Sequence, residues 1–249
     1  WKVTLLDNLS RRGADINLER LLREHTRNLS FVKADVRYDQ KILDREAARH
    51  DVIIHLAAQV AVTTSVADPR TDFEINALGT FNMLEAARKA KTQPIFLYSS
   101  TNKVYGDLET IPIKESATRY MFKGFPQGIS ERQQLDFHSP YGCSKGAADK
   151  YVRDYARIYG IPTVVFRQSC IYGPNQFGVE DQGWLAWFAI ASLFKKPVTV
   201  YGNGKQVRDV LHVSDLVTLY ERAIDRIKKA RGEAFNVGGG PDRAISLLD

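Results

Sequence analysis

The sequence predicts an α/β fold in which a doubly wound parallel sheet carries helices on both faces. Short apolar runs rich in β-branched residues alternate with segments whose apolar residues recur at helical spacing. This alternation is typical of βαβ units. Small or polar residues follow several of the predicted strands, at the edge where such sheets bind ligands. We therefore expect the functional site at the carboxyl ends of the strands.

Composition excludes several classes of protein. The chain has 249 residues, 44% of them hydrophobic and 26% charged, which is ordinary for a globular protein. Its net charge of +6 comes from scattered basic residues, so we expect no nucleic-acid partner. The most apolar run, residues 52–62, is too short to span a membrane. Two cysteines make no disulfide framework and favour a cytoplasmic location, and no His or Cys spacing predicts a metal site.

The first predicted strand, residues 2–6, ends at Asp7. In a dinucleotide-binding unit, an acidic residue at a strand end bonds the adenosine ribose about 20 residues after a glycine-rich loop. No such loop precedes Asp7, and Gly238-Gly239-Gly240 lies near the other end. We therefore expect a fragment that lacks roughly the first strand, the glycine loop and the first helix. Residues 247–249 resemble the start of a further helix, so we also expect a missing carboxyl end.

Further elements follow in alternation. We expect strands at residues 29–32, 52–59, 94–98, 161–166, 198–201 and 234–238, and helices at 16–26, 40–49, 72–91, 139–159, 183–194 and 216–229. Residues 108–138 show no periodicity, and a loop of this length is usually functional or mobile. Asn76 lies near the buried stripe of its helix and needs a polar partner there. His55 is better explained as a packed residue than as a catalyst.

Three hydroxyl residues, Ser99, Ser100 and Thr101, follow the strand at 94–98. Such a cluster lies where a substrate is expected, although hydroxyls also cap turns. The helix that follows carries Tyr141 and Lys145, four residues apart and thus on one face. An ammonium near a phenol lowers the pKa of the phenol, which would make Tyr141 an acid or base usable near neutral pH. The pattern alone also fits an ordinary amphipathic helix.

In their order and spacing these motifs resemble the extended short-chain dehydrogenase/reductase family of NAD-dependent nucleotide-sugar epimerases and dehydratases. The matching segments are 6–10, 34–37, 55–59 with Ser65 and 68–69, Asn76 with 79–80, 99–106, 141–145, 172–174, 208–209 and 212–213. The resemblance implies a Rossmann-like NAD-binding domain at 1–170. It also implies a small substrate-binding lobe at 171–249, some segments of which return to the first domain.

The resemblance further implies NAD as a tightly bound cofactor that is regenerated in each turnover. Its binding residues would be Asp7, Asn8, Asp35, Val36, Leu56, Ala57, Ala58, Gln59, Asn76, Tyr141, Lys145 and Gln168. Tyr141 would be the catalytic acid/base, Lys145 would hold the nicotinamide ribose, and Thr101 would bond the reacting hydroxyl. Substrate would be bound by Thr101, Asn102, Ser169, Cys170 and Arg208, with Arg208 on the pyrophosphate.

Longer runs are similar to the subgroup of this family that epimerises C2 of a CDP-linked dideoxyhexose for lipopolysaccharide O-antigen synthesis. They are residues 99–107, 135–149, 181–184 and 204–212. That subgroup oxidises its substrate transiently to a 2-keto sugar. Two departures from the wider family concern the sugar: Cys170 stands where many members have asparagine, and Asn175 where arginine is common.

Three alternatives stay open on the sequence. A 4-epimerase of UDP-hexoses would share every cofactor residue. A 4,6-dehydratase would place an Asp-Glu pair where Asn102 and Lys103 stand. A non-catalytic NAD-binding protein would often lack the tyrosine or the lysine. The family also implies a homodimer or homotetramer, formed through the helices that begin near Asp72 and Tyr141.

Overall fold

The computed structural model describes residues 1–249. Its strands are β1 (Val3–Asp7), β2 (Leu29–Lys33), β3 (Val52–His55), β4 (Ile95–Thr101), β5 (Ile113–Glu115), β6 (Tyr120–Phe122), β7 (Thr163–Gln168), β8 (Cys170–Tyr172), β9 (Arg208–His212), β10 (Ala234–Val237) and β11 (Ala244–Ile245). Its helices are α1 (Ala14–Glu24), α2 (Gln40–Ala47), α3 (Val62–Ala67), α4 (Pro69–Phe73), α5 (Gly79–Lys89), α6 (Ser139–Tyr159), α7 (Trp184–Leu193), α8 (Val213–Asp225) and α9 (Ile227–Ala230).

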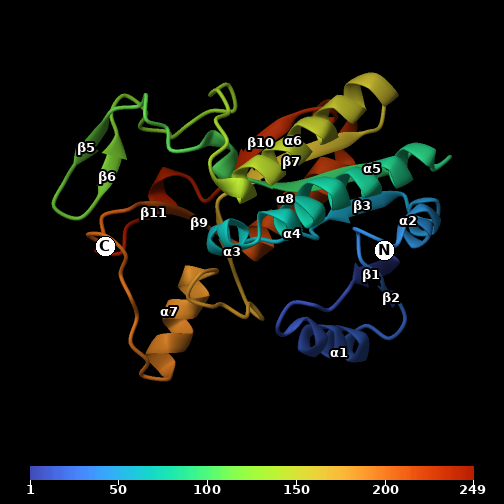
Figure 1. The fold of residues 1–249 in the computed structure, drawn as a ribbon, viewed down its shortest axis with the longest axis horizontal. Coiled ribbons are helices and arrows are strands. Elements are labelled where there is room, and N and C mark those ends of the chain that lie inside the picture. Colours follow the sequence, from blue (N-terminus) through green and yellow to red (C-terminus); the bar gives the residue numbers. More distant parts are fainter.

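The central sheet is parallel, with the strand order β10-β7-β4-β3. Helices cover both of its faces (Figure 1). Alternate residues of β4 show this, because Phe96 and Tyr98 pack in a core with α2, α5 and α6, whereas Leu97 packs in a second core with α8. The predicted doubly wound sheet is therefore confirmed.

β1 and β2 form a separate parallel pair, and no hydrogen bond joins β1 to β3. A cavity of about 770 Å³ lies between the amino ends of β1 and β2 and the segment from α2 to β3. Leu56, at the end of β3, is 58% exposed. The expectation that a strand and a glycine loop precede residue 1 stays a prediction.

A helical run from residue 69 to 89 replaces the single helix predicted at 72–91. It consists of α4, a π-helical turn at Glu74–Leu78 and α5. π-helical turns are rare and frequently lie at functional sites. This one carries Asn76, whose side chain is completely buried.

α6 begins and ends at the residues that the sequence indicates. Ser139 Oγ accepts a 3.2 Å hydrogen bond from the backbone N–H of Gly142, which satisfies a donor of the first turn. Gly160 ends the helix in the left-handed conformation, at φ 73°. Tyr141 and Lys145 therefore lie in the first two turns.

The structure corrects three other expectations. Residues 198–201 form no strand. The segment 108–138, predicted to be irregular, contains the β5–β6 hairpin, which projects from the body in Figure 1. The helix predicted at 216–229 is divided into α8 and α9, and its cap is His212, whose Nδ1 accepts from the Ser214 N–H.

Segments after residue 170 are shared between the sheet and a smaller part of the fold. β8, β9 and β11 form a separate three-stranded sheet, while β10 returns to the central sheet beside β7. The division into domains at residue 170 stays a prediction. None of the helices has the length and apolar character needed to cross a membrane.

Candidate active site

Tyr141, Lys145 and Thr101 meet at the carboxyl end of β4. Thr101 is the last residue of β4, and its hydroxyl lies close enough to the Tyr141 phenol to lower the pKa of that phenol. All three side chains are buried. A hydroxyl and a phenol at one strand end, with an ammonium one helical turn away, form a group that can exchange a proton with a bound alcohol.

Lys145 is fixed by the strand opposite its helix. Its Nζ donates a 2.6 Å hydrogen bond to the carbonyl oxygen of Ser99 and lies 4.3 Å from the centre of the Tyr98 ring. Burial lowers the pKa of Lys145 to about 7, although Asp149 and Asp72 oppose this shift. The ammonium form is therefore retained up to about neutral pH.

The pKa of Tyr141 differs from the sequence expectation. Burial raises the pKa of the phenol above its usual value, Thr101 lowers it by a smaller amount, and Asp72 adds to the increase. Lys145 makes its hydrogen bond to Ser99 and not to the phenol. The predicted lowering of the Tyr141 pKa by Lys145 is therefore wrong for this arrangement, in which burial of the phenol dominates.

Asn76 holds the segment after β3. Its Oδ1 accepts from the Gln59 N–H at 2.9 Å, and its Nδ2 donates to the Gln59 carbonyl oxygen at 3.0 Å. Asp72 accepts from the side chains of Asn76, Gln59 and Ser144, the last of which is a neighbour of Lys145. This network fixes Gln59 against Ser144 in the second turn of α6. The buried amide of Asn76 therefore has the polar partners that it needs, while its supporting role at a cofactor site stays a prediction.

Asp7 at the end of β1 and Asp35 after β2 differ in how many carboxylate oxygens are free to bind a ligand. Asp7 is exposed, and one of its oxygens accepts from the Leu9 N–H. Both oxygens of Asp35 are occupied, because Asn8 Nδ2 donates at 2.8 Å and Arg37 donates from its backbone and guanidinium. The Arg37 hydrogen bonds hold the pKa of Asp35 well below its usual range. Asp7 can accept from a ligand, whereas the Asp35 carboxylate orients Asn8.

The predicted substrate residues lie on β7, β8 and β9. Ser169 Oγ donates to the Asp209 carbonyl oxygen at 2.6 Å, and Cys170 faces Val210 across the β8–β9 pair. Arg208 begins β9, two residues before Val210, and its guanidinium donates only to Val207 and Gln206. Cys170 and Arg208 therefore lie on adjacent strands, with Arg208 two residues before the partner of Cys170.

Other predicted residues have separate positions. The side chain of Gln168 donates to the Tyr220 hydroxyl at 2.5 Å, on the face of the sheet that α8 covers, so the structure does not direct it toward Tyr141. Asn102 is exposed beside Thr101, and the Val36 side chain is buried in the core. His55 is hydrogen-bonded to Thr80, and burial together with Lys145 lowers its pKa to about 3, which agrees with a packed, neutral histidine.

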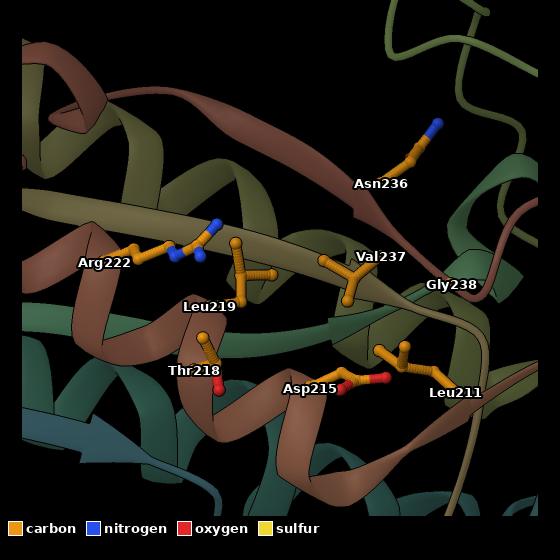
Figure 2. A pocket seen from close by; sticks show the side chains of 8 residues that line it. All are labelled: Leu211, Asp215, Thr218, Leu219, Arg222, Asn236, Val237 and Gly238. Carbon is orange, nitrogen blue, oxygen red and sulfur yellow. The ribbon is translucent and has the colours of Figure 1, made fainter.

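A hollow of about 390 Å³ lies between α8 and β10, apart from these residues. Figure 2 shows the residues that line it, which include the apolar side chains of Leu211, Leu219 and Val237. Asp215 and Arg222 line it from α8. It contains none of the predicted site residues. It is therefore separate from the group around Tyr141.

Sequence reasoning missed four residues at the site. Asp72 and Ser144 belong to the network around Asn76, and Asp149 lies one turn beyond Lys145. The signal for Asp72 was its spacing of four residues from Asn76, which places both on one helical face. Lys103 is the fourth, because burial and, to a smaller extent, the positive charge of Arg208 lower its pKa. No spacing along the sequence indicated this interaction between the two charges.

Comparison with known proteins agrees with this geometry. The model of the NAD dependent epimerase/dehydratase family matches residues 1–238. The chain belongs to this family. It is 50% identical to the CDP-paratose 2-epimerase of Salmonella typhi, over 98% of the chain and 74% of that protein. A putative UDP-glucose 4-epimerase of Methanocaldococcus jannaschii is 31% identical, over 100% of the chain and 72% of that protein.

Solved structures of the epimerase/dehydratase family have the same fold. UDP-glucose 4-epimerase from Thermotoga maritima, solved with UDP-glucose, has a TM-score of 0.78 and 29% identity, over 99% of the chain and 71% of that structure. UDP-glucuronic acid 4-epimerase from Bacillus cereus, solved with UDP-glucuronic acid and NAD, has a TM-score of 0.78 and 26% identity. The match covers 100% of the chain and 72% of that structure.

The residues present fit the NAD that this family uses. Lys145 has one acceptor in the structure, so its ammonium keeps two further donors for the hydroxyls of a ribose. Asp7 keeps one carboxylate oxygen free at a strand end. Ala57 and Ala58 follow β3, are half-buried, and have the smallest side chains after glycine. These residues would hold the ribose and nicotinamide portions of the cofactor.

Proposed function

We propose that the protein converts CDP-paratose to CDP-tyvelose by epimerisation at C2, with NAD as a tightly bound cofactor. The observation that carries this proposal is the 50% identity to a CDP-paratose 2-epimerase over 98% of the chain. It is supported at the site, because Thr101 is followed by Asn102 and Lys103 and not by the acidic pair of a dehydratase. A cytoplasmic place in O-antigen synthesis belongs to the same proposal.

The chemistry requires transient oxidation, because C2 of the sugar is not acidified by a neighbouring carbonyl. Tyr141, beside Thr101, takes the proton of the C2 hydroxyl and later returns it. When bound, NAD would supply the redox chemistry by accepting hydride from C2 and returning it to the other face. Between the loss and the return of hydrogen, the 2-keto sugar would rotate in the site and present its other face. Arg208 and Lys103 carry the positive charge that would anchor the diphosphate while the sugar turns.

A 4-epimerase of UDP-hexoses is the second candidate, since relatives with that name match the full chain at about one third identity. The experiment incubates the full-length protein with CDP-paratose, without added cofactor, and follows the C2 proton by NMR. Conversion to CDP-tyvelose supports the proposal. No conversion, with NAD detected in the denatured protein by mass spectrometry, would reject it in favour of UDP-hexoses. A protein that keeps NAD and turns over no nucleotide sugar would be a non-catalytic NAD-binding protein.

We also propose a homodimer, or a homotetramer built from it, formed through the helices around α5 and α6. Phe73, Phe81 and Tyr151 on this surface are 56%, 37% and 51% exposed. Large apolar side chains gathered on one surface are typical of protein–protein interfaces. Light scattering of the full-length protein tests this, and a monomer at micromolar concentration would contradict it.

A further inference from the structure

A buried ion pair lies behind the candidate active site and has no part in the mechanism above. Arg167 of β7 donates to Asp149 of α6 from two nitrogens, at 2.9 Å and 3.0 Å. The two side chains are 2% and 0% exposed. Two charges lose hydration when they are buried, so such a pair is weak evidence of a contribution to stability. Its position suggests another role.

The Asp149 carboxylate also contacts the strand that carries Thr101. Ser100 Oγ donates to Asp149 Oδ2 at 2.9 Å, and Ser100 immediately precedes Thr101. Along α6, Asp149 lies four residues after Lys145 and eight after Tyr141, so the three side chains share one helical face. A single carboxylate therefore joins α6 to both β4 and β7 at the level of the site.

Further hydrogen bonds fix Arg167, the cation of this ion pair. Arg167 Nη1 donates to the Tyr105 hydroxyl at 2.9 Å, which donates to Asn236 Oδ1 at 2.7 Å. Asn236 Nδ2 donates to the carbonyl oxygen of Ile129, in the long segment before α6. Figure 2 shows Asn236 pointing away from the hollow beneath β10. Arg167 is thereby held from several elements, and it holds Asp149 in one place.

We propose that Asp149 is a positioning residue, whose carboxylate keeps the Tyr141–Lys145 face of α6 in register with Thr101 at the end of β4. Its kinetic consequence rests on the proposed function. Small displacements of catalytic groups are costly, and a shift of about 1 Å lowers the rate on the order of 100-fold. Loss of the carboxylate should therefore lower kcat and leave KM little changed.

The charges around Lys145 give a second consequence that does not depend on any substrate. Asp149 faces the ammonium from α6 and Asp72 from α4, while the Tyr98 ring of β4 lies beneath it. His55 of β3 is neutral at neutral pH because its pKa is lowered to about 3. Both carboxylates raise the pKa of Lys145 against the effect of burial. Removal of Asp149 should shift the titration of Lys145 to lower pH.

The test compares Asp149→Asn and Asp149→Glu in the full-length protein, labelled with ¹³C-lysine. The ¹³Cε resonance of Lys145, assigned with Lys145→Arg, is followed over pH, and kcat and KM are measured for CDP-paratose. Glu85→Gln is the matched control, because that α5 carboxylate also accepts from α6, through Tyr155 at 2.7 Å. Asp149→Asn should lower the midpoint and reduce kcat on the order of 100-fold. Asp149→Glu should restore part of both, and Glu85→Gln should change neither.

A folded Asp149→Asn protein with an unchanged Lys145 midpoint and unchanged kcat would overturn the proposal. If that variant does not fold, Ser100→Ala breaks the contact with β4 without changing any charge. It should lower kcat about tenfold, the effect of about 1.4 kcal/mol, and an unchanged kcat would count equally against the proposal. A wild-type protein that does not convert CDP-paratose, but whose Lys145 midpoint responds to Asp149→Asn, would reject only the substrate.

Discussion

The Lys145 ammonium donates a 2.6 Å hydrogen bond to the carbonyl oxygen of Ser99, two residues before Thr101. This contact joins the second turn of α6 to the end of β4. It directs one donor of the ammonium into the strand and leaves two for a ligand. In the proposed function Lys145 would therefore act through its position and its remaining donors, while burial raises the pKa of Tyr141.

Replacement of Tyr141 by phenylalanine should lower turnover of CDP-paratose roughly 100- to 10,000-fold, the range of general acid–base catalysis. Only a hydroxyl is removed, so thermal unfolding should be nearly unchanged. Tyr159→Phe is the control, because that tyrosine lies on the same helix and is half exposed. Residual turnover above about a tenth of wild type would remove Tyr141 from its assigned role.

Lys103→Met should raise KM for the nucleotide sugar about 10- to 100-fold, as expected when a charge-assisted hydrogen bond is lost. The reason is that the positive charges of Lys103 and Arg208 act on each other, with a smaller opposing effect from Asp107, and two such cations favour an anion. Steady-state kinetics measure the effect, with Lys114→Met on the exposed strand β5 as the control. Equal KM values in both variants would exclude Lys103 from substrate binding.

Asn76→Ala should destabilise the protein by about 2–4 kcal/mol, since it leaves both the N–H and the carbonyl of Gln59 without their partner. Urea unfolding measures this loss. Asn82→Ala serves for comparison, because that side chain is partly exposed and donates only to the carbonyls of Val36 and Arg37. The Asn76 network would not be structural if the two variants lost the same stability.

Glu85 predicts a pH-dependent contribution to stability. Hydrogen bonds from Arg88 and Tyr155 lower its pKa from 4.5 to about 2. A lowered pKa stabilises the fold above the unfolded value, and this stabilisation is lost as pH falls from about 4.5 to about 2. Glu85→Gln should therefore cost at most about 1 kcal/mol at pH 7, because solvent screens the pair. Chemical unfolding at pH 7 and pH 2 should show the difference disappearing, and a constant difference would contradict this pKa.

The sequence was sufficient to predict the parallel sheet and the helix that carries Tyr141 and Lys145, because both depend on local patterns. β-branched runs fix the strands, and Ser139 and Gly160 mark the ends of α6. Residues 198–201 fit the same strand pattern but form no strand in the structure. Strand pairing depends on neighbours far along the chain, and a local pattern does not reveal them.

The candidate site was less predictable than the fold. The position of Thr101 at the carboxyl end of a strand predicted the group around it. The hydrogen bond of Lys145 to Ser99 could not be predicted, because the two residues are 46 positions apart in the sequence. The same limit applies to Asp149 and Arg167, whose pairing depends on the crossing of α6 over β7. The pKa of Tyr141 depends on burial, which spacing along a helix does not measure.

The most direct test of the central claim is conversion of CDP-paratose by the full-length protein in D₂O, with deuterium at C2 of the product measured by NMR and mass spectrometry. Oxidation and return of the same hydrogen within the site predicts CDP-tyvelose that retains protium at C2. Incorporation of solvent deuterium at C2 would contradict this account, because it would mean that C2 loses a proton to the solvent.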